Sequence, residues 1–141
     1  MGASFESLIP NGDVRMGYHS VHKYRRYLMR MFGEDVLAQY LKIMEDIRTT
    51  STQKELEEAD KRYRDFMDSL EGDHEFGIRS FVDHSDCDGD FSSEQCEYIA
   101  KAFYALLDTD IVTDEDDRDT VRELAELFES TAHNDGVVMI W

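Results

Sequence analysis

Apolar side chains recur at helical spacing through most of this chain, and that periodicity constrains the fold more than any other feature. Intervals of three and four residues between apolar positions place them on one face of an α-helix. The only proline is Pro10, near the N-terminus, so no later helix is broken by one. Hydrophobic residues make up 41% of the 141 residues, which is enough to build a core without disulfide support. The sequence therefore predicts a mainly α protein of about five helices, folded as a single domain over residues 1–141.

The start of the fourth predicted helix carries the clearest local signal. Ser92 is followed three residues later by Gln95, the spacing of a capping box in which each side chain accepts from the other residue's backbone N–H.

The segment before this helix, residues 73–83, shows no clean period, and we expect a buried connector or a short strand there. The other expected caps and stops are Ser20 and Gly33 for the first helix and Ser51 or Thr52 and Gly72 for the third. The apolar stripes of the five helices fall within residues 21–32, 36–47, 56–70, 99–106 and 121–128.

Two segments near the ends of the chain predict strands. Residues 137–141 are apolar, and they follow the turn-forming sequence Asn-Asp-Gly at 134–136. A lone strand needs a partner, and residues 3–9, followed by a turn at Pro10–Asp13, are the obvious one. The expected fold class is therefore α+β, with a minor two-stranded element beside the helices.

The charge of the chain is strongly negative and unevenly placed. The net charge is −17; residues 1–50 hold 7 basic and 6 acidic residues, and residues 51–141 hold 8 and 26. Such a surface repels bare nucleic acid and anionic lipid, so we expect neither as a direct ligand. It attracts cations and basic protein surfaces, although acidic residues also serve only to keep a protein in solution. No apolar run reaches the length of a membrane span and residues 1–10 lack the features of a signal peptide, so we expect a cytoplasmic protein.

The segment from His84 to Cys96 holds a dense set of oxygen-bearing side chains. Alternating acids before a glycine are typical of a loop that wraps a hard cation, and Gly89 fits position 6 of an EF-hand calcium loop. The carboxylates of this candidate calcium site are Asp86, Asp88, Asp90 and Glu94.

Both ends of the loop depart from the EF-hand pattern. Position 1 is His84, a poor calcium ligand, and position 12 is Gln95 rather than a bidentate Glu. The alternative is a tight turn whose acids bond their own backbone amides and precede a helix N-terminus, where negative charge is favourable. The sequence therefore predicts either a weak calcium site or a rigid acidic turn.

The two cysteines allow a further chemistry. Cys87 and Cys96 are expected to be reduced thiols in the cytosol. Together with His84, His19 or His22 they suggest zinc, but zinc sites use closely paired ligands and the spacing here is wider. The chain has no P-loop, dinucleotide-binding, zinc-protease or serine-hydrolase motif. A thiol- or metal-dependent enzyme is kept as a hypothesis, because catalytic groups meet in space rather than in sequence.

Two charged segments invite a functional interpretation. Lys23, Arg26 and Arg30 form a basic stripe on the first helix, with Arg25 beside it, and we expect it to dock on the protein's own acids rather than on a phosphate. The acidic run 114–119 opens the fifth helix, where the helix dipole favours it. Spaced carboxylates also imitate the phosphates of nucleic acid, so the run suits a mimic that inhibits a DNA- or RNA-handling protein.

The chain resembles a family of small acidic bacterial proteins without an established activity. The likeness rests on Gly17-Tyr18, on the run Tyr24-Arg25-Arg26-Tyr27-Leu28 and, above all, on the block His84–Cys96. The chain departs from that family in His19 and His22 and in ending with Trp141, where a cysteine is expected. The resemblance implies the fold outline and a role for the loop, and it transfers no mechanism.

These observations favour a non-enzymatic binding or regulatory protein whose acidic surface meets a basic protein partner. The loop at residues 84–96 would serve as a rigid element or a weak calcium site. The nucleic-acid mimic and the thiol- or metal-dependent enzyme are the alternatives.

Overall fold

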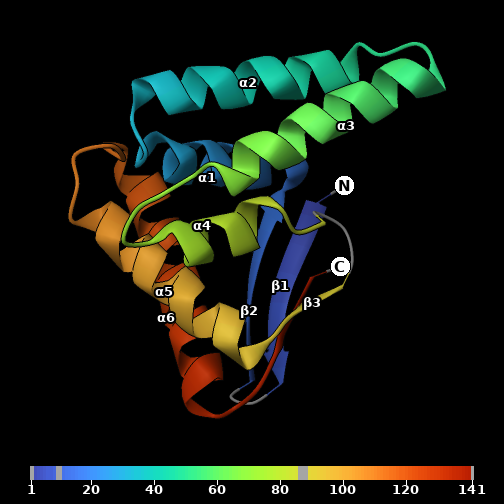
Figure 1. Ribbon diagram of the computed structural model, residues 1–141. Coiled ribbons are helices and arrows are strands. Elements are labelled where there is room, and N and C mark those ends of the chain that lie inside the picture. Colours follow the sequence, from blue (N-terminus) through green and yellow to red (C-terminus); the bar gives the residue numbers. More distant parts are fainter. Residues whose placement is uncertain (1, 9–10, 86–88, 141) are drawn as a thin grey trace.

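The computed structural model describes residues 2–8, 11–85 and 89–140, which form six helices and a four-stranded antiparallel sheet (Figure 1). The mainly helical α+β fold is confirmed, but the expected five helices and two strands are too few. The elements in chain order are β1 (Gly2–Leu8), β2 (Asn11–Gly17), α1 (Tyr18–Arg30), α2 (Glu34–Arg48), α3 (Gln53–Asp68), α4 (Glu75–Val82), β3 (Asp90–Phe91), α5 (Ser93–Leu107), α6 (Glu115–His133) and β4 (Val138–Ile140).

The sheet has the strand order β2-β1-β4-β3, so the two ends of the chain lie side by side at its centre. β4 pairs with β1, as expected, with Phe5 opposite Ile140. The turn expected at Pro10–Asp13 is wrong for residues 11–13, because β2 begins at Asn11 and pairs with β1 along its whole length. Pro10 lies outside the described residues. β2 has no strand signal in the sequence because only three apolar residues occur in residues 11–18.

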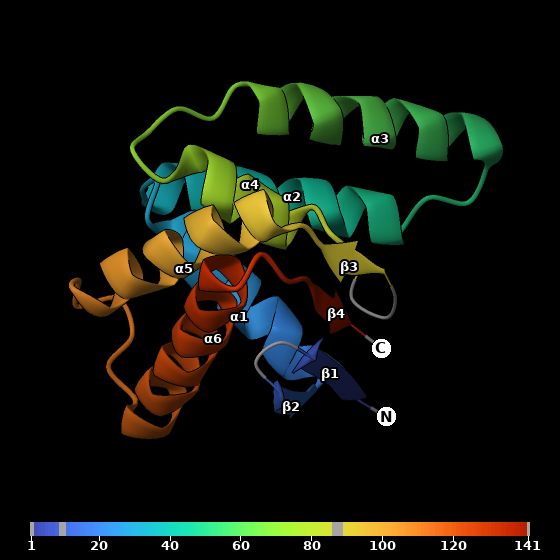
Figure 2. The same cartoon turned by 90° about the horizontal axis from the view of Figure 1, so that it is seen from below.

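One face of the sheet is covered by helices, with α1, α5 and α6 on the same side in Figure 2. Phe5, Phe91 and Ile140 point to this side and are almost fully buried. The ring of Phe91 meets Phe128 of α6 edge-on at 5.2 Å between centroids, and Phe81 of α4 stacks on Phe5 at 5.8 Å. Offset and edge-on contacts of this kind stabilise a core beyond the area they bury. A cluster of phenylalanines therefore ties the sheet to α4 and α6.

Residues 75–82 form helix α4, and not the connector or strand expected for residues 73–83. The helix has only eight residues, and its buried residues Gly77, Ile78, Phe81 and Val82 share one face over barely two turns, too short a stripe to give a clear period in the sequence. Gly77 packs against α5 so closely that a Cβ there would lie 2.1 Å from the carbonyl oxygen of Tyr98. This close approach at Gly77 positions α4 against α5.

The predicted caps are partly confirmed. Ser92 and Gln95 form the full capping box, with bonds of 2.9 and 3.2 Å, at the start of α5. Thr52, not Ser51, caps α3 by accepting from the Glu55 amide. The expected cap Ser20 is wrong, because α1 starts at Tyr18 with Gly17 as its N-cap.

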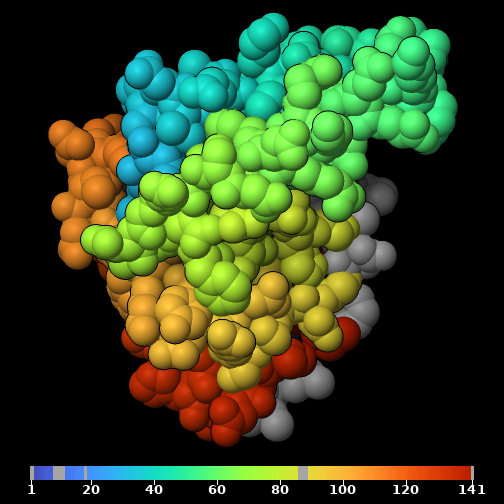
Figure 3. All heavy atoms as spheres, viewed as in Figure 1, coloured from blue at the N-terminus to red at the C-terminus, as the bar shows by residue number. Residues whose placement is uncertain are grey.

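Helices α2 and α3 form an antiparallel arm. Figures 1 and 3 show the turn between them extending past the rest of the molecule. Tyr40 and Ala59 are buried between the two helices and the body, whereas Leu41 and Leu56 are exposed.

Candidate functional site

The loop between α4 and α5 is flanked by helices on both sides, as an EF-hand loop would be. Two of the four predicted calcium ligands, Asp86 and Asp88, lie outside the described residues. Asp90 is exposed in β3, and Glu94 is exposed in the first turn of α5. Among the described residues, no three His, Cys, Asp or Glu side chains come close enough to hold a metal ion. The calcium site therefore stays a prediction.

His84 is built into this loop. Its ring stacks on Phe91 with 3.9 Å between centroids, and its two nitrogens lie 2.9 Å from the Ser85 carbonyl oxygen and 2.6 Å from the Asp90 carbonyl oxygen. In an EF-hand the carbonyl at position 7, here that of Asp90, binds the ion. The His84 ring makes a hydrogen bond with that carbonyl oxygen, and so it links the two sides of the loop. Arg25, buried in α1, donates to the backbone carbonyl of His84.

The cysteine of α5 is not placed for chemistry. Cys96 is fully buried, and its Sγ lies 3.6 Å from the carbonyl oxygen of Phe91. Burial raises the pKa of this thiol to about 11, which disfavours the nucleophilic thiolate. Cys87 lies outside the described residues. The geometry of Cys96 gives the thiol-dependent enzyme no support, and that hypothesis remains untested.

Two of the three residues of the basic stripe of α1, Lys23 and Arg30, pair with acids of the protein, as expected. Lys23 donates to Asp117 of α6 at 2.7 Å, and Arg30 pairs with Glu34 at 3.1 Å. Tyr27 also donates to Asp117, at 2.7 Å. Asp117 therefore joins α1 to α6.

The acidic run of residues 114–119 has several internal roles. Asp114 caps α6 by accepting from the Asp117 amide at 2.9 Å. Arg118, within the run, donates to the carbonyl oxygens of Val112 and Leu107 at 3.0 and 2.8 Å. Because these groups stabilise the start of α6, the run gives no specific support to nucleic-acid mimicry, which stays a hypothesis.

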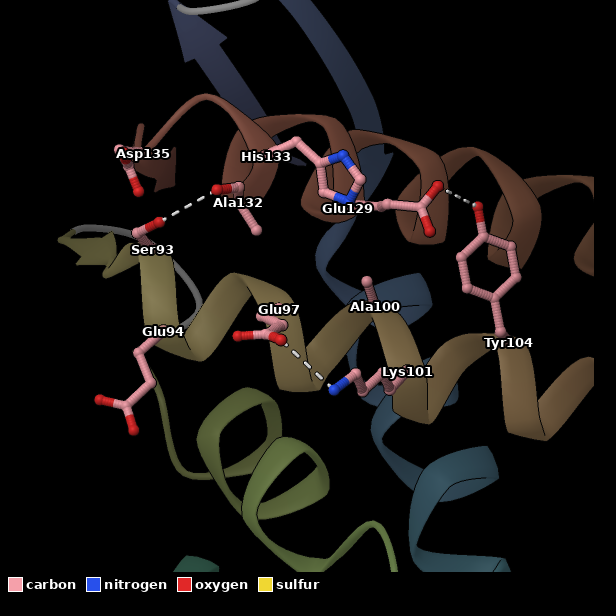
Figure 4. A pocket seen from close by; sticks show the side chains of 10 residues that line it. All are labelled: Ser93, Glu94, Glu97, Ala100, Lys101, Tyr104, Glu129, Ala132, His133 and Asp135. Atoms are coloured by element: carbon pink, nitrogen blue, oxygen red, sulfur yellow. Dashed lines mark hydrogen bonds and ion pairs between the residues drawn. The ribbon is translucent and has the colours of Figure 1, made fainter.

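A groove between α5 and α6 encloses a volume of about 520 Å³ (Figure 4). That volume is in the range of small-ligand pockets. Two alanines, Ala100 and Ala132, form part of its lining, and their small side chains leave room between the helices. The polar lining residues are Ser93, Glu94, Glu97, Lys101, Tyr104, Glu129, His133 and Asp135.

Three hydrogen bonds hold the groove in shape. Tyr104 of α5 donates to Glu129 of α6 at 3.2 Å, and Ser93 donates to the Ala132 carbonyl at 3.4 Å (Figure 4). Lys101 bonds Glu97 along α5 at 3.3 Å. Burial, and then the bond to Glu129, raises the pKa of Tyr104, so its hydroxyl stays a neutral donor. The two helices are thus joined at both ends of the groove.

The groove is suited to a positively charged ligand. Its lining carries four carboxylates, Glu94, Glu97, Glu129 and Asp135, and a single lysine. A cation entering the groove would meet the field of these carboxylates in a partly enclosed space, where charges are screened less than on an open surface.

Sequence reasoning identified only Glu94 of these residues. The groove residues of α5 at 94, 97, 101 and 104 are spaced by three, four and three, so they share one face of the helix. This polar face of α5 is the sequence feature that could have indicated the groove. Its opposite wall, on α6, follows only from the way the two helices pack.

No helix in the described part of the chain is both long and apolar enough to span a membrane. Comparison of the chain with protein-family models, with curated proteins and with solved structures finds no match. The resemblance based on the His84–Cys96 block therefore stays an expectation.

Proposed function

We propose that this protein is a non-enzymatic binding module that holds a basic segment of a partner protein in the groove between α5 and α6. The observation that carries the proposal is the charge of the groove: four carboxylates and one lysine around a hollow of about 520 Å³. The net charge of −17 would add long-range attraction and would speed association with a basic partner.

The groove favours flexible basic side chains over a compact ion. Glu97 is already bonded to Lys101, which shows how a lysine ammonium is held on this surface. Glu129 lies on the opposite wall and accepts a single bond from Tyr104, which leaves carboxylate lone pairs for a ligand. A lysine or arginine of the partner would fit between the two walls.

Binding can be measured with a fluorescently labelled hexalysine peptide by anisotropy. The variant Glu97→Gln/Glu129→Gln removes one charge from each wall while keeping the size of the side chains. Since an exposed ion pair contributes roughly 0.2–1 kcal/mol, we expect the dissociation constant to rise about two- to thirtyfold.

The matched control is Asp35→Asn/Asp65→Asn, which removes the same charge from exposed positions of α2 and α3. We expect it to change the dissociation constant less than twofold. Equal weakening in both double variants would show that only net charge attracts the peptide and would overturn the proposed groove. Failure of the unmodified protein to bind the peptide would do the same.

A further inference from the structure

We infer that two copies of this chain join through strand β2 and form one continuous sheet. β2 is the outer strand of the order β2-β1-β4-β3, and it is seven residues long. Figure 2 shows it at one end of the sheet, with β1 on its inner side. Its free edge carries unpaired backbone groups that can pair with another strand.

The backbone alternation shows which groups face outward. The N–H of Ile140 donates to the carbonyl of Gly89, toward β3, so the pair Phe5–Ile140 has no hydrogen bonds of its own. Phe5 therefore directs its N–H and C=O toward Val14 of β2. By the same alternation, Asp13 and Arg15 direct theirs away from the sheet, toward a new strand.

The side chains at these two positions complement each other. Asp13 and Arg15 are exposed on the uncovered face of the sheet, and the Arg15 Nε lies 2.8 Å from an Asp13 carboxylate oxygen. In an antiparallel pairing centred on Val14, Asp13 of each copy lies opposite Arg15 of the other. Like charges that face each other across two strands destabilise their pairing. In the proposed dimer, by contrast, both facing pairs consist of Asp13 and Arg15, so both attract.

The resulting assembly is closed. Joining two β2 strands gives the order β3-β4-β1-β2-β2-β1-β4-β3, whose outer strands β3 have only two residues each. Such short edges do not continue the sheet, so the contact ends at a dimer with two-fold symmetry.

Repulsion between the copies acts against this contact. Each chain carries a net charge of −17, and Glu123 and Glu126 of α6 lie near β2 on its covered face. At 0.15 M salt the screening length is about 8 Å, so the long-range repulsion is weakened while pairs in contact are kept. The dimer is therefore expected at physiological salt and should weaken near 10 mM.

Sedimentation equilibrium over a concentration series tests the inference with two charge reversals, Asp13→Arg and Arg15→Asp. Either alone places two like-charged pairs opposite each other, and we expect the dimer dissociation constant to rise at least about fivefold. An equimolar mixture of the two variants restores opposite charges at both pairs, and so does the double variant Asp13→Arg/Arg15→Asp. Both should dimerise as the unmodified protein does.

Three results would overturn the inference: an unmodified protein that stays monomeric at 0.15 M salt, single variants that dimerise undiminished, or a mixture that does not recover. Amide hydrogen exchange gives a readout on the unmodified chain, independent of how the variants fold. The amides of Asp13 and Arg15 should become protected as protein concentration rises, and unchanged exchange would contradict the contact. None of these outcomes depends on the groove between α5 and α6.

Discussion

At the scale of single residues, Asp117 is the polar group on which the contact between α1 and α6 depends. Burial alone would raise the pKa of its carboxyl, but the hydrogen bonds from Lys23 and Tyr27 outweigh it and hold the pKa below its ordinary value of 3.8. The same contact raises the pKa of Lys23, and burial with the bond to Asp117 raises the pKa of Tyr27 to about 12. Around neutral pH Asp117 is therefore ionised, Lys23 is positively charged and the Tyr27 hydroxyl is protonated.

The lowered pKa of Asp117 makes its contribution to stability depend on pH. A carboxyl with a lower pKa in the folded state stabilises the fold above its unfolded pKa, and this stabilisation is lost as the pH falls through the folded pKa. Asp117→Asn should lower the free energy of unfolding at pH 7 by about 1–2 kcal/mol, since a bond to a charged group is lost. At pH 3 the gap between variant and parent should shrink. Urea denaturation at both pH values measures it.

Asp116→Asn is the control for this change, because the neighbouring side chain is exposed. It should stay within about 0.5 kcal/mol of the parent at both pH values. An Asp117→Asn variant as stable as the parent at pH 7 would show that the contact contributes nothing net.

At the scale of elements, α4 is held by its fit to α5. Its position depends on Gly77, whose missing side chain lets the two helices touch. The exposed rings of Phe76 and Tyr98 meet edge-on at 5.1 Å at the same junction. The junction also sets where the loop containing His84 begins.

Gly77→Ala tests this fit through the sign of its effect. In a helix without tertiary contacts alanine is more stable than glycine by about 1 kcal/mol. Here the new methyl group would clash with the Tyr98 carbonyl, and overpacking costs about 1–3 kcal/mol, so we expect a net loss of stability. Thermal unfolding, with Ser80→Ala in the same helix as control, measures it. A stabilised Gly77→Ala protein would show that α4 shifts freely.

The elements predicted correctly from the sequence are those whose signal is local. Ser92 and Gln95 fix the start of α5 through their own bonds, and the apolar run that follows the turn at 134–136 marks β4. β2 and α4 were missed because their stability comes from neighbours: β2 from its pairing with β1, and α4 from the contact at Gly77. The groove was missed for the same reason, since Glu129 meets Tyr104 only after α6 packs on α5.

At the scale of the whole molecule, the excess of acids opposes folding. The chain holds 32 acidic and 15 basic residues, so repulsion exceeds attraction over the surface. Raising sodium chloride from 10 to 200 mM should therefore raise the melting temperature, by about 2–5 °C. A falling melting temperature would show that the surface ion pairs outweigh the repulsion.

A comparison of calcium chloride with magnesium chloride distinguishes general charge screening from specific binding of calcium by the loop at residues 84–96. The predicted calcium site at residues 84–96 implies a larger, saturable rise of the melting temperature in calcium chloride than in magnesium chloride at matched ionic strength. An equal rise in the two salts would show that screening alone acts and would contradict the site.

The position of β4 also bears on how the protein is made. It lies between β1 and β3, yet it is formed by residues 138–140. During translation β1, β2 and the first helices emerge well before residues 138–140 are made. Until then the outer edge of β1 in the β1–β2 hairpin has no pairing strand, and residues 138–140 complete the sheet.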